Sequence, residues 1–451
     1  MSIQSHTAGA IVVTAAATAL LALTFGHRAV HGMFIGPLNS ATGAGFAAVS
    51  LALAVSQLVA GLSQPLCGAL SDRFGPARIV FGGGLLLALG TAMLTLASST
   101  AGLMFAFGLI AAATGAVGST PVLLAAVTAR VPEERRDLAT GVVGSGASLG
   151  QFALPPLTQL SIAAAGWASA LVGLALLSLA ALPLARTLRG VHSRRSPSAS
   201  VGAPSDRVDA TRREAFGDAR YWAIAVGFAL CGFHVSFMLA HMPGVIEGCG
   251  FGGQLTGIWF SIMGLANMAG SIGVGFALQQ FAPRKILAFV YAARALGVAV
   301  FLWAPKTEPV MLGFAVWMGL TYMATMPPTA ALVSRFYGTR HLGTLFGVVM
   351  LVHQIGSFLG VWLGGWVFER YGSFQGIWLL DIVLALLAVA INFAIPERAR
   401  QEAATPDPRK TRPASARADR NGASAPEWHG RQSPRASSPL SAAPSAAAGS
   451  G

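Results

Sequence analysis

The chain has 451 residues, of which 54% are apolar and only 10% are charged, and 54 are glycines. This composition excludes an ordinary soluble domain and indicates that lipid surrounds most of the chain. The formal net charge of +13 would suggest a nucleic-acid ligand in a soluble protein, but the basic residues gather in short loops and a polar tail, so nucleic acid is excluded as a partner.

Apolar runs of about 20 residues, the length that crosses a bilayer core of about 30 Å, recur between Ala8 and Ile395. The first run lacks the basic start and the small-residue cleavage site of a signal peptide, so we expect it to remain as the first helix. It is longer than a straight span needs and should be tilted or bent. The first six helices are predicted at residues 9–37, 44–71, 77–98, 102–129, 137–164 and 167–187.

Two segments rich in Ser, Pro, Ala and Arg, residues 191–218 and 397–451, are too polar to form a core and are expected to be a disordered cytoplasmic linker and tail. Six further helices are predicted at residues 219–244, 252–280, 284–304, 308–334, 340–368 and 373–395. The sequence therefore predicts an all-α membrane protein of twelve transmembrane helices, with six-helix bundles in residues 1–190 and 219–396.

Lysine and arginine are sorted to one side of this predicted bundle. The even-numbered loops carry 17 of the 30 basic residues and the final tail carries nine, whereas the odd-numbered loops carry two, Lys306 and Arg370. The remaining two, Arg28 and Arg294, lie inside helices. Because positively charged loops stay in the cytoplasm, we expect both termini on the cytoplasmic side of the inner, or plasma, membrane.

A shift of 206 residues superposes the two halves, as expected of a duplicated carrier. The shared offset holds across about 140 positions. The matched landmarks are Gly26 with Gly232, Pro37 with Pro243, Pro121 with Pro327, Gly141 with Gly347, Gly150 with Gly356, and Gly166 with Gly372.

The loop between the second and third helices reads GALSDRFGPAR. It resembles the loop signature of the major facilitator superfamily, at Gly68, Asp72, Arg73, Gly75 and Arg78. The resemblance implies a gating loop, in which glycines permit a tight turn and a charge cluster latches the outward-facing state. It also implies alternating access about a site near the membrane midplane, between the halves.

The match is incomplete. Pro76 stands where the family usually has a basic residue, and the second half reads GFALQQFAPRK from Gly275, with Gln279 and Gln280 in place of the acid and the base. The gate should therefore be asymmetric. The simpler alternative is that the charged loop residues only cap helix ends.

Several ionisable residues lie within the predicted helices, where each needs a partner, a water-filled cavity or a functional role. Arg28 and His31 are three residues apart on helix 1, so they share a face, and Arg28 should lie about 9 Å outward of the helix middle. The 206-residue shift places His234 opposite Arg28. The full set is His27, Arg28 and His31 on helix 1, His234 and His241 on helix 7, and His353 on helix 11.

This set predicts a class of small-molecule substrate. Arginine offers a fork of donors that matches a carboxylate, and histidine changes charge near neutral pH, so the set suits an organic anion moved with a proton. The alternative is that the histidines bond to carbonyls or neighbouring helices and that Arg28 braces the bundle. Uncharged candidates, for which helix–helix hydrogen bonding competes as an interpretation, are Gln57, Gln64, Gln151, Asn267 and Gln354.

Arg294 on helix 9 and Asp381 on helix 12 lie at similar depth, and a structural ion pair between them is one interpretation. Carboxylates are otherwise nearly absent from the helices, so a coupled proton would have to bind histidine. Prolines are expected to kink helices 4, 5 and 10, at Pro121, Pro155, Pro156, Pro327 and Pro328.

The helical region is diffusely similar to bacterial monocarboxylate and oxalate/formate carriers. Those carriers bind the substrate carboxylate with a helix-8 arginine, four residues after an acid or an asparagine. Here Asn267 is present, but Ser271 replaces the arginine. The resemblance therefore implies a carboxylate carrier only if Arg28 has taken over the binding of the anion.

Other interpretations stay open. A membrane sensor or scaffold would use the tail for docking. An enzyme is disfavoured, because the sequence shows no nucleophile with a paired base and no phosphate-binding loop, and we expect no metal, no cofactor and a monomer. A proton-linked drug or metabolite exporter would carry a helix-5 signature that the chain half fits: Gly141, Gly150 and Pro155 match, and Leu154, Thr158 and Gln159 do not.

Overall fold

The structure is a computed structural model that describes residues 3–189 and 211–396, with side chains from residue 9 onward. These residues are helical apart from short connections, and they contain no strand. The N-terminal half contains α1 (Ile3–Val30), the 3₁₀ segment η1 (His31–Phe34), α2 (Ile35–Thr42), α3 (Phe46–Phe74), α4 (Pro76–Met93), α5 (Thr100–Val117), α6 (Thr120–Thr128), η2 (Glu133–Arg135), α7 (Arg136–Ser178) and α8 (Ala181–Thr187).

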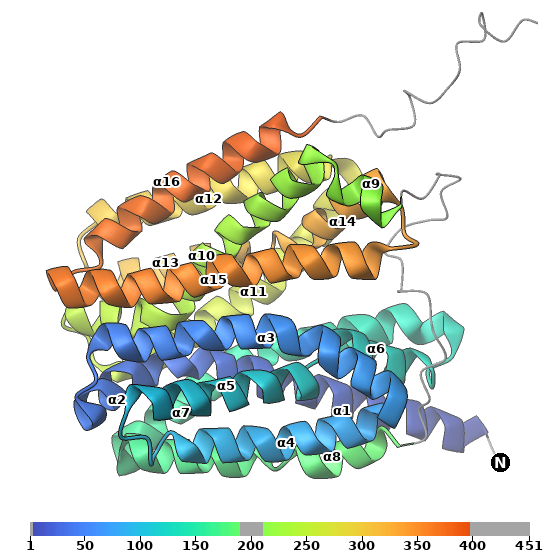
Figure 1. Ribbon diagram of the computed structural model, residues 1–451, viewed down its shortest axis with the longest axis horizontal. Helices are drawn as coiled ribbons and strands as arrows, with labels where there is room; N and C mark the ends of the chain where they lie inside the picture. Colours follow the sequence, from blue (N-terminus) through green and yellow to red (C-terminus); the bar gives the residue numbers. More distant parts are fainter. Residues whose placement is uncertain (1–2, 190–210, 397–451) are drawn as a thin grey trace, which may run out of the picture. The chain divides into compact units, whose positions relative to one another are not determined.

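The C-terminal half follows the same order of long and broken helices (Figure 1). It contains α9 (Arg212–Phe216), α10 (Ala219–Gly248), α11 (Gly253–Gln280), α12 (Pro283–Trp303), α13 (Glu308–Tyr322), α14 (Met326–Tyr337), α15 (Leu342–Tyr371) and α16 (Gln375–Ala394).

Eleven helical stretches in the described residues are long and apolar enough to cross a membrane. One of them, Glu133–Thr187, has 55 residues, and a straight helix of that length would be more than twice as long as the bilayer core. Gly166 interrupts it with φ 83° and ψ 167°, a conformation essentially restricted to glycine. The stretch therefore makes two crossings, which gives the twelve that the sequence predicts.

Three other spans are bent or broken. The first span is bent as expected, because η1 separates α1 from α2. A break separates α5 from α6 just before Pro121, and the corresponding break in the second half separates α13 from α14 just before Pro327. In helix 5, Pro155 and Pro156 lie inside α7, and the backbone leaves helical φ and ψ only at Gly166, the boundary between the fifth and sixth helices. The kink expected at these two prolines stays a prediction.

The repeat landmarks form the same close helix crossing in each half. Where α1 crosses α7, a Cβ on Gly26 would lie 2.8 Å from the Gly150 carbonyl oxygen. Where α10 crosses α15, Gly232 and Gly356 take the same roles, and a Cβ on Gly356 would lie 1.9 Å from the Ala229 carbonyl oxygen. Glycine is needed at these positions because only a hydrogen side chain lets two helix backbones come so close.

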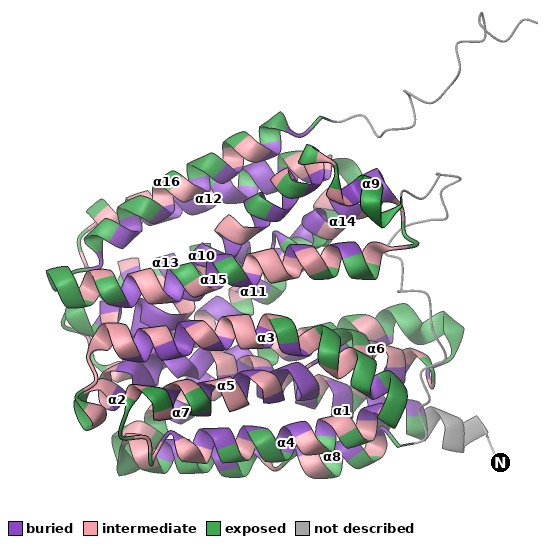
Figure 2. Ribbon diagram, viewed as in Figure 1, coloured by how far each residue is buried: buried purple, intermediate pink, exposed green. Residues whose placement is uncertain are grey.

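The two halves contact each other mainly through α3 with α15 and α7 with α11 (Figure 1). Along the face of α3 toward α15, Ser50 is buried against Gly365, and Gly61 packs on Gln354. Two turns further along the same face, a Cβ on Gly68 would meet no atom of another helix within 4 Å, and the end of α3 is largely exposed (Figure 2). The contact between the halves is therefore lost toward the end of α3.

The same gradient runs along the other helices of this interface. Near the start of α15, Gly343 and Gly347 have open space around them, as does Gly141 near the start of α7. At the other end, Gly253 of α11 lies against the Gln159 side chain of α7. The halves are thus closed at the end that carries residues 43–45 and separated at the end that carries the gating loop.

The gating loop is a tight turn, as its glycines predict. Gly75 has φ 86° and ends α3, and Pro76 begins α4. Asp72, Arg73 and Arg78 are exposed, and they take part in neither of the two ion pairs among the described residues. The charge cluster that the family resemblance implies is therefore open in this conformation, in which the halves are apart at this end.

The last part of the expected linker is helical. Thr211 precedes α9, and its hydroxyl accepts a hydrogen bond from the Glu214 main-chain N–H while the Glu214 carboxylate accepts one from Thr211 N–H. This capping box stabilises the first turn of a helix, so residues 212–216 are ordered rather than disordered. The remainder of the expected linker up to residue 210, and the expected tail from residue 397, lie outside the described residues.

Candidate solute site between the halves

A cavity lies where α1, α3, α10 and α15 meet, so both halves contribute to its wall. It has room for about one water molecule in this conformation, and a larger solute requires the halves to move. The lining residues are Arg28, His31, Gly32, Leu53, Gln57, Ser236, Leu239, Ala240 and Val361.

Arg28 is the charged side chain in this lining. Its Nη2 donates to the Gln57 side-chain oxygen at 3.3 Å, and the Gln57 main-chain oxygen accepts a hydrogen bond of 3.0 Å from Gln354 Nε2 on α15. Neither ion pair of the described residues includes Arg28. A guanidinium inside the membrane without a carboxylate is costly, so the cavity has a positive charge that a bound anion would balance.

The other two predicted residues of helix 1 differ in exposure to this cavity. His31 lines it, packs on the edge of Phe107 and leaves its buried Nε2 without a hydrogen-bond partner. His27 lies one turn away, with Nε2 at 3.0 Å from Ser178 Oγ on α7 and Nδ1 without a partner. Arg28 and His31 are thus together at the cavity, and His27 lies behind them.

Helix 11 contributes a pair of side chains that connects to Arg28. His353 Nδ1 lies 3.1 Å from the Gln354 side-chain oxygen, and the His353 ring packs on Phe228 with a centroid distance of 4.5 Å and a tilt of 40°. Gln354 joins this pair to Gln57 across the two halves. Both residues lie outside the cavity lining, and their contacts connect α15 to α3.

His241 belongs to the closed end of the molecule. Its Nε2 donates to the Val361 carbonyl oxygen at 2.8 Å. Its ring lies among Phe46, Phe237 and Phe374, with centroid distances of 5.5–5.9 Å. Phe46 comes from the N-terminal half, so His241 packs at a seal of aromatic rings between the halves rather than in the cavity.

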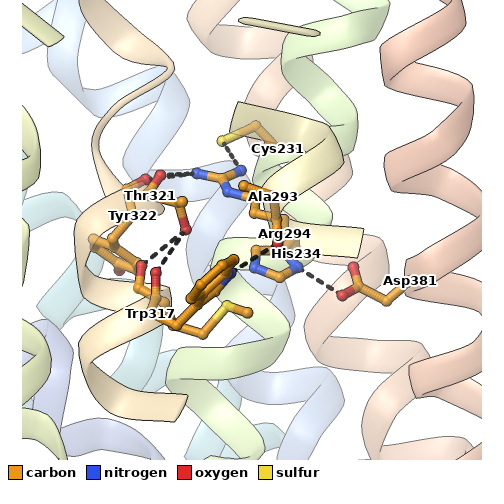
Figure 3. Close-up of polar contacts among 9 residues, drawn as sticks. Cys231, His234, Ala293, Arg294, Trp317, Thr321, Tyr322 and Asp381 are labelled. Carbon is orange, nitrogen blue, oxygen red and sulfur yellow. Dashed lines mark hydrogen bonds and ion pairs between the residues drawn. The ribbon is translucent and has the colours of Figure 1, made fainter. Parts of the chain in front are cut away.

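The buried charges of the C-terminal half pair differently from the expectation. Asp381 Oδ2 on α16 lies 2.6 Å from His234 Nδ1 on α10. Arg294 donates instead to Cys231 Sγ at 3.1 Å and to the main-chain oxygens of Thr321 and Tyr322. Figure 3 shows the Asp381 carboxylate pointing toward His234, with the Arg294 guanidinium on the other side of that histidine. The expected ion pair between Arg294 and Asp381 is therefore wrong, because the carbonyls freed at the α13–α14 break take the guanidinium.

Asn267 and Gln151 lie where α11 meets α7. Asn267 Nδ2 donates weakly to Ser148 Oγ at 3.4 Å, and its Oδ1 accepts a hydrogen bond of 3.2 Å from the Met323 main-chain N–H at the α13–α14 break. Gln151 is buried, with Nε2 unpartnered. The structure therefore places Asn267 as a connection between helices, as the competing interpretation proposed.

Two polar residues near the cavity were not singled out from the sequence. Ser236 lines it from α10, two residues after His234. Tyr322, the last residue of α13, lies in the neighbourhood of Arg28 and comes from the other half. No signal in the sequence distinguishes Ser236 from other helix serines, whereas Tyr322 could have been noticed as an aromatic residue with a hydroxyl close before Pro327.

Comparisons with known proteins agree with this architecture. The family model of the Major Facilitator Superfamily matches residues 14–361 and 309–442. Monocarboxylate transporter 13 of Bos taurus is 26% identical over 353 residues, which cover 78% of this chain and 81% of that protein. Monocarboxylate transporter 11 of Homo sapiens is 27% identical over 359 residues, which cover 77% of this chain and 74% of that protein.

Among solved structures, the fold matches that of a bacterial homologue of the human lysosomal transporter Spinster in an inward-facing and unoccupied conformation. The TM-score is 0.68 at 15% sequence identity, and the match covers 88% of this chain and 98% of that one. At this identity, the similarity concerns the fold alone.

Proposed function

Because this chain belongs to the Major Facilitator Superfamily, we propose that it is a secondary transporter that carries a small organic anion, such as a monocarboxylate, together with a proton. Membership in the superfamily supports transport of a small solute by alternating access. The chemistry of the cavity between the halves supports the choice of an anion. We propose that it acts as a monomer in the inner, or plasma, membrane.

The observation that carries the anion is the unpaired guanidinium of Arg28. It lines the cavity beside His31 and Gln57, and its hydrogen-bond partner, the Gln57 amide, is neutral. A carboxylate placed there would accept a pair of charge-assisted hydrogen bonds from the guanidinium, which is the strong form of this interaction. It would also cancel the excess charge of the cavity.

The relatives support the same class of substrate. The relatives from Bos taurus and Homo sapiens described above are both named monocarboxylate transporters. This chain has Ser271 at the position where the resembled carriers have a helix-8 arginine. In this chain the arginine at the cavity is Arg28 on α1, so the anion would bind to the N-terminal half.

The distribution of basic residues supports an assignment of the open end to one side of the membrane. Positively charged loops stay in the cytoplasm, so the gating loop and both termini face the cytoplasm. The structure is then open inward. At the opposite, extracellular end the Glu369 carboxylate accepts a hydrogen bond of 2.5 Å from Ala47 N–H across the halves, and Phe46 packs on Phe368 at 4.6 Å.

The test is a binding and transport assay with purified protein. A panel of acetate, lactate, pyruvate, oxalate and benzoate is screened by thermal shift and by uptake into proteoliposomes, at pH 5.5 and pH 7.5. A bound ligand raises the melting temperature of the folded protein. For the carboxylate that binds best, Arg28→Gln should weaken binding by about 100-fold, since it removes a charge-assisted pair of hydrogen bonds.

Two variants control this experiment. Arg370→Gln removes an exposed arginine at the end of α15 and should leave binding unchanged. Arg28→Lys keeps the positive charge but loses the forked pair of N–H donors. The affinity for the carboxylate should therefore fall by less than in Arg28→Gln. Full transport of the carboxylate by Arg28→Gln would refute the anion proposal. Stabilisation by bulky cations or neutral drugs, without stabilisation by carboxylates, would favour a proton-linked exporter.

A further inference from the structure

His27 and His31 are neighbouring rings that each bury a nitrogen without a hydrogen-bond partner. The unpartnered atoms are His27 Nδ1 and His31 Nε2. The ring centroids are 5.8 Å apart, with an angle of 68° between the planes. Because about 90% or more of buried polar groups in proteins are hydrogen-bonded, two exceptions in adjacent rings beside a cavity require a specific explanation.

The hydrogen bonds of Ser178 determine which nitrogen of His27 has a free lone pair. Ser178 Oγ donates its proton to the Leu174 carbonyl oxygen at 2.8 Å. We assign the hydroxyl proton to this shorter contact, so Ser178 Oγ accepts at 3.0 Å from His27 Nε2, which then carries the hydrogen. His27 Nδ1 is then a bare lone pair inside the protein, directly behind the histidine that lines the cavity.

The charged surroundings of the two rings are simple. Arg28, between them in sequence, is the nearest charge, and Tyr322 on α13 lies in the neighbourhood of Arg28. Among the described residues that contact the rings or line the cavity, those from the other helices are uncharged, and they include Gln57 on α3, Phe107 on α5, Ser178 on α7 and Ser236 on α10. The titratable His234 and His241 also lie on α10, outside this lining. The charge state of the two histidines therefore depends chiefly on Arg28 and on what binds to it.

We propose that His27 and His31 together form the binding site for the proton that is carried with the anion, an inference that rests on the proposed function. A hydronium ion that reaches the cavity gives its proton to a ring nitrogen of His31, where an N–H bond forms and water is left. His27, whose ring centroid lies 5.8 Å away, offers a second free nitrogen, so either ring can hold the proton. The same bond breaks when the proton leaves on the other side of the membrane. One proton and one monovalent anion then cross together, without net charge.

The position of Arg28 explains why the two ligands would bind together. While the cavity is empty, the guanidinium repels a proton on His31. A carboxylate bound to Arg28 cancels that repulsion, so each ligand strengthens the binding of the other, as linkage requires. His241 has the same pattern as His27, with Nε2 on the Val361 carbonyl oxygen and Nδ1 unpartnered, but its ring packs among aromatic rings at the closed end and not beside the cavity. His31 has no hydrogen bond of that kind at Nε2.

A titration that needs no substrate tests the site directly. Wild-type protein with ¹⁵N-labelled histidine is reconstituted into liposomes, and solid-state NMR follows the ring nitrogens from pH 4.5 to 9. His27→Gln and His31→Gln assign the signals. Both rings should titrate as a coupled pair, and Arg28→Gln should raise their midpoint by about one pH unit or more, because it removes the nearest positive charge. Independent titration of the two rings, or no response to Arg28→Gln, would overturn the proposal.

Transport measurements test the role of the site. For the carboxylate that the wild type transports, His27→Gln and His31→Gln should lower accumulation driven by a pH gradient at least tenfold. Exchange of labelled for unlabelled carboxylate should fall less than accumulation in His27→Gln, whose ring lies outside the cavity lining. Ser178→Ala removes the hydrogen bond that fixes the His27 tautomer, so it should shift the pH dependence of carboxylate uptake. His341→Gln, at the start of α15 and outside the cavity, is the matched control and should match the wild type.

The outcomes separate this inference from the proposed function. If the histidine variants keep full pH-driven accumulation, the proton site is refuted and the anion carrier stands. If the wild type transports no carboxylate, the proposed function fails. The coupled titration and its dependence on Arg28 then still decide whether the two rings share a proton.

Discussion

Asp381 is buried in α16, and its one ion-pair partner among the described residues is His234. A carboxylate at this depth in a membrane protein is costly unless a charge or a strong donor compensates it. The 2.6 Å contact joins α10, which lines the cavity, to α16, which lies at the side of the C-terminal half (Figure 1). We interpret this pair as a structural connection within the half.

The stability of Asp381→Asn tests that interpretation. Removing one partner of a buried pair leaves the other uncompensated, so the variant should lose about 3–5 kcal/mol of unfolding free energy. The double variant His234→Leu/Asp381→Leu removes both and should regain most of the loss. Denaturation of the protein in detergent measures both. An Asp381→Asn variant with normal stability but no pH-driven uptake would instead assign the pair to proton coupling.

The sequence predicted that Arg28 and His31 lie together, but it did not predict the partners of the buried polar residues. Arg28 and His31 were predicted as a pair because ionisable residues three apart in an apolar run share a helix face, and both line the cavity. The partners could not be predicted, because they come from helices far along the chain. Ser178 is 151 residues from His27, and Asp381 is 147 residues from His234.

At the scale of the helices, two glycines of α7 have opposite environments. A Cβ on Gly150 would lie 1.9 Å from the Ala22 carbonyl oxygen of α1. A Cβ on Gly141 would meet no atom of another helix within 4 Å. In a helix interior, alanine is favoured over glycine by about 1 kcal/mol when nothing opposes it. The two positions therefore respond to the same substitution with opposite signs.

Gly141→Ala should accordingly leave the melting temperature unchanged or raise it slightly. Gly150→Ala should lower it clearly, because α1 and α7 have to separate to admit the methyl group, and the crossing at Gly26 is lost with them. Thermal unfolding of both variants in the same detergent gives the comparison. Equal melting temperatures would mean that the α1–α7 crossing tolerates a wider separation than its contacts indicate.

Helix positions followed from the sequence, because apolar length and turn residues are local properties. The division of the fifth and sixth helices was predicted between residues 164 and 167, and Gly166 is the residue at which the backbone breaks. The extent of the α13–α14 break was less predictable. Proline removes one donor, but Arg294 and Asn267 stabilise the freed main-chain groups of Thr321, Tyr322 and Met323 from other helices.

At the scale of the whole bundle, the sequence predicted two halves but not their relative position, because the same helix faces meet in more than one state of a carrier. The face of α3 that carries Ser50 and Gly61 continues through Gly68 to Asp72 at spacings of three and four residues. Its first part is packed and its last part is exposed. Only the structure shows at which end of the bundle the halves are in contact and at which end they are separated.

Two matched cysteine pairs test this state of the molecule. A Cβ on Gly61 would lie 3.1 Å from Gln354 Cβ, near the range for a disulfide, so Gly61→Cys/Gln354→Cys should cross-link with a mild oxidant. Gly68 lies seven residues after Gly61 on α3, and Gly347 lies seven residues before Gln354 on α15, which runs antiparallel to α3. This second pair therefore lies two turns closer to the gating loop. Gly68→Cys/Gly347→Cys should resist oxidation and react only with a long bifunctional maleimide.

Both pairs are placed in a background in which Cys67, Cys231 and Cys249 are replaced by serine and transport is retained. Alternating access requires the open end to close at some point in the cycle, so the Gly68/Gly347 pair should become oxidisable when a transported carboxylate is present on both sides of the membrane and the carrier cycles. The Gly61/Gln354 pair should then cross-link more slowly, since its end must open in turn. If both pairs instead cross-link equally well without substrate, the halves are not separated at the gating loop, and an inward-open resting state is wrong.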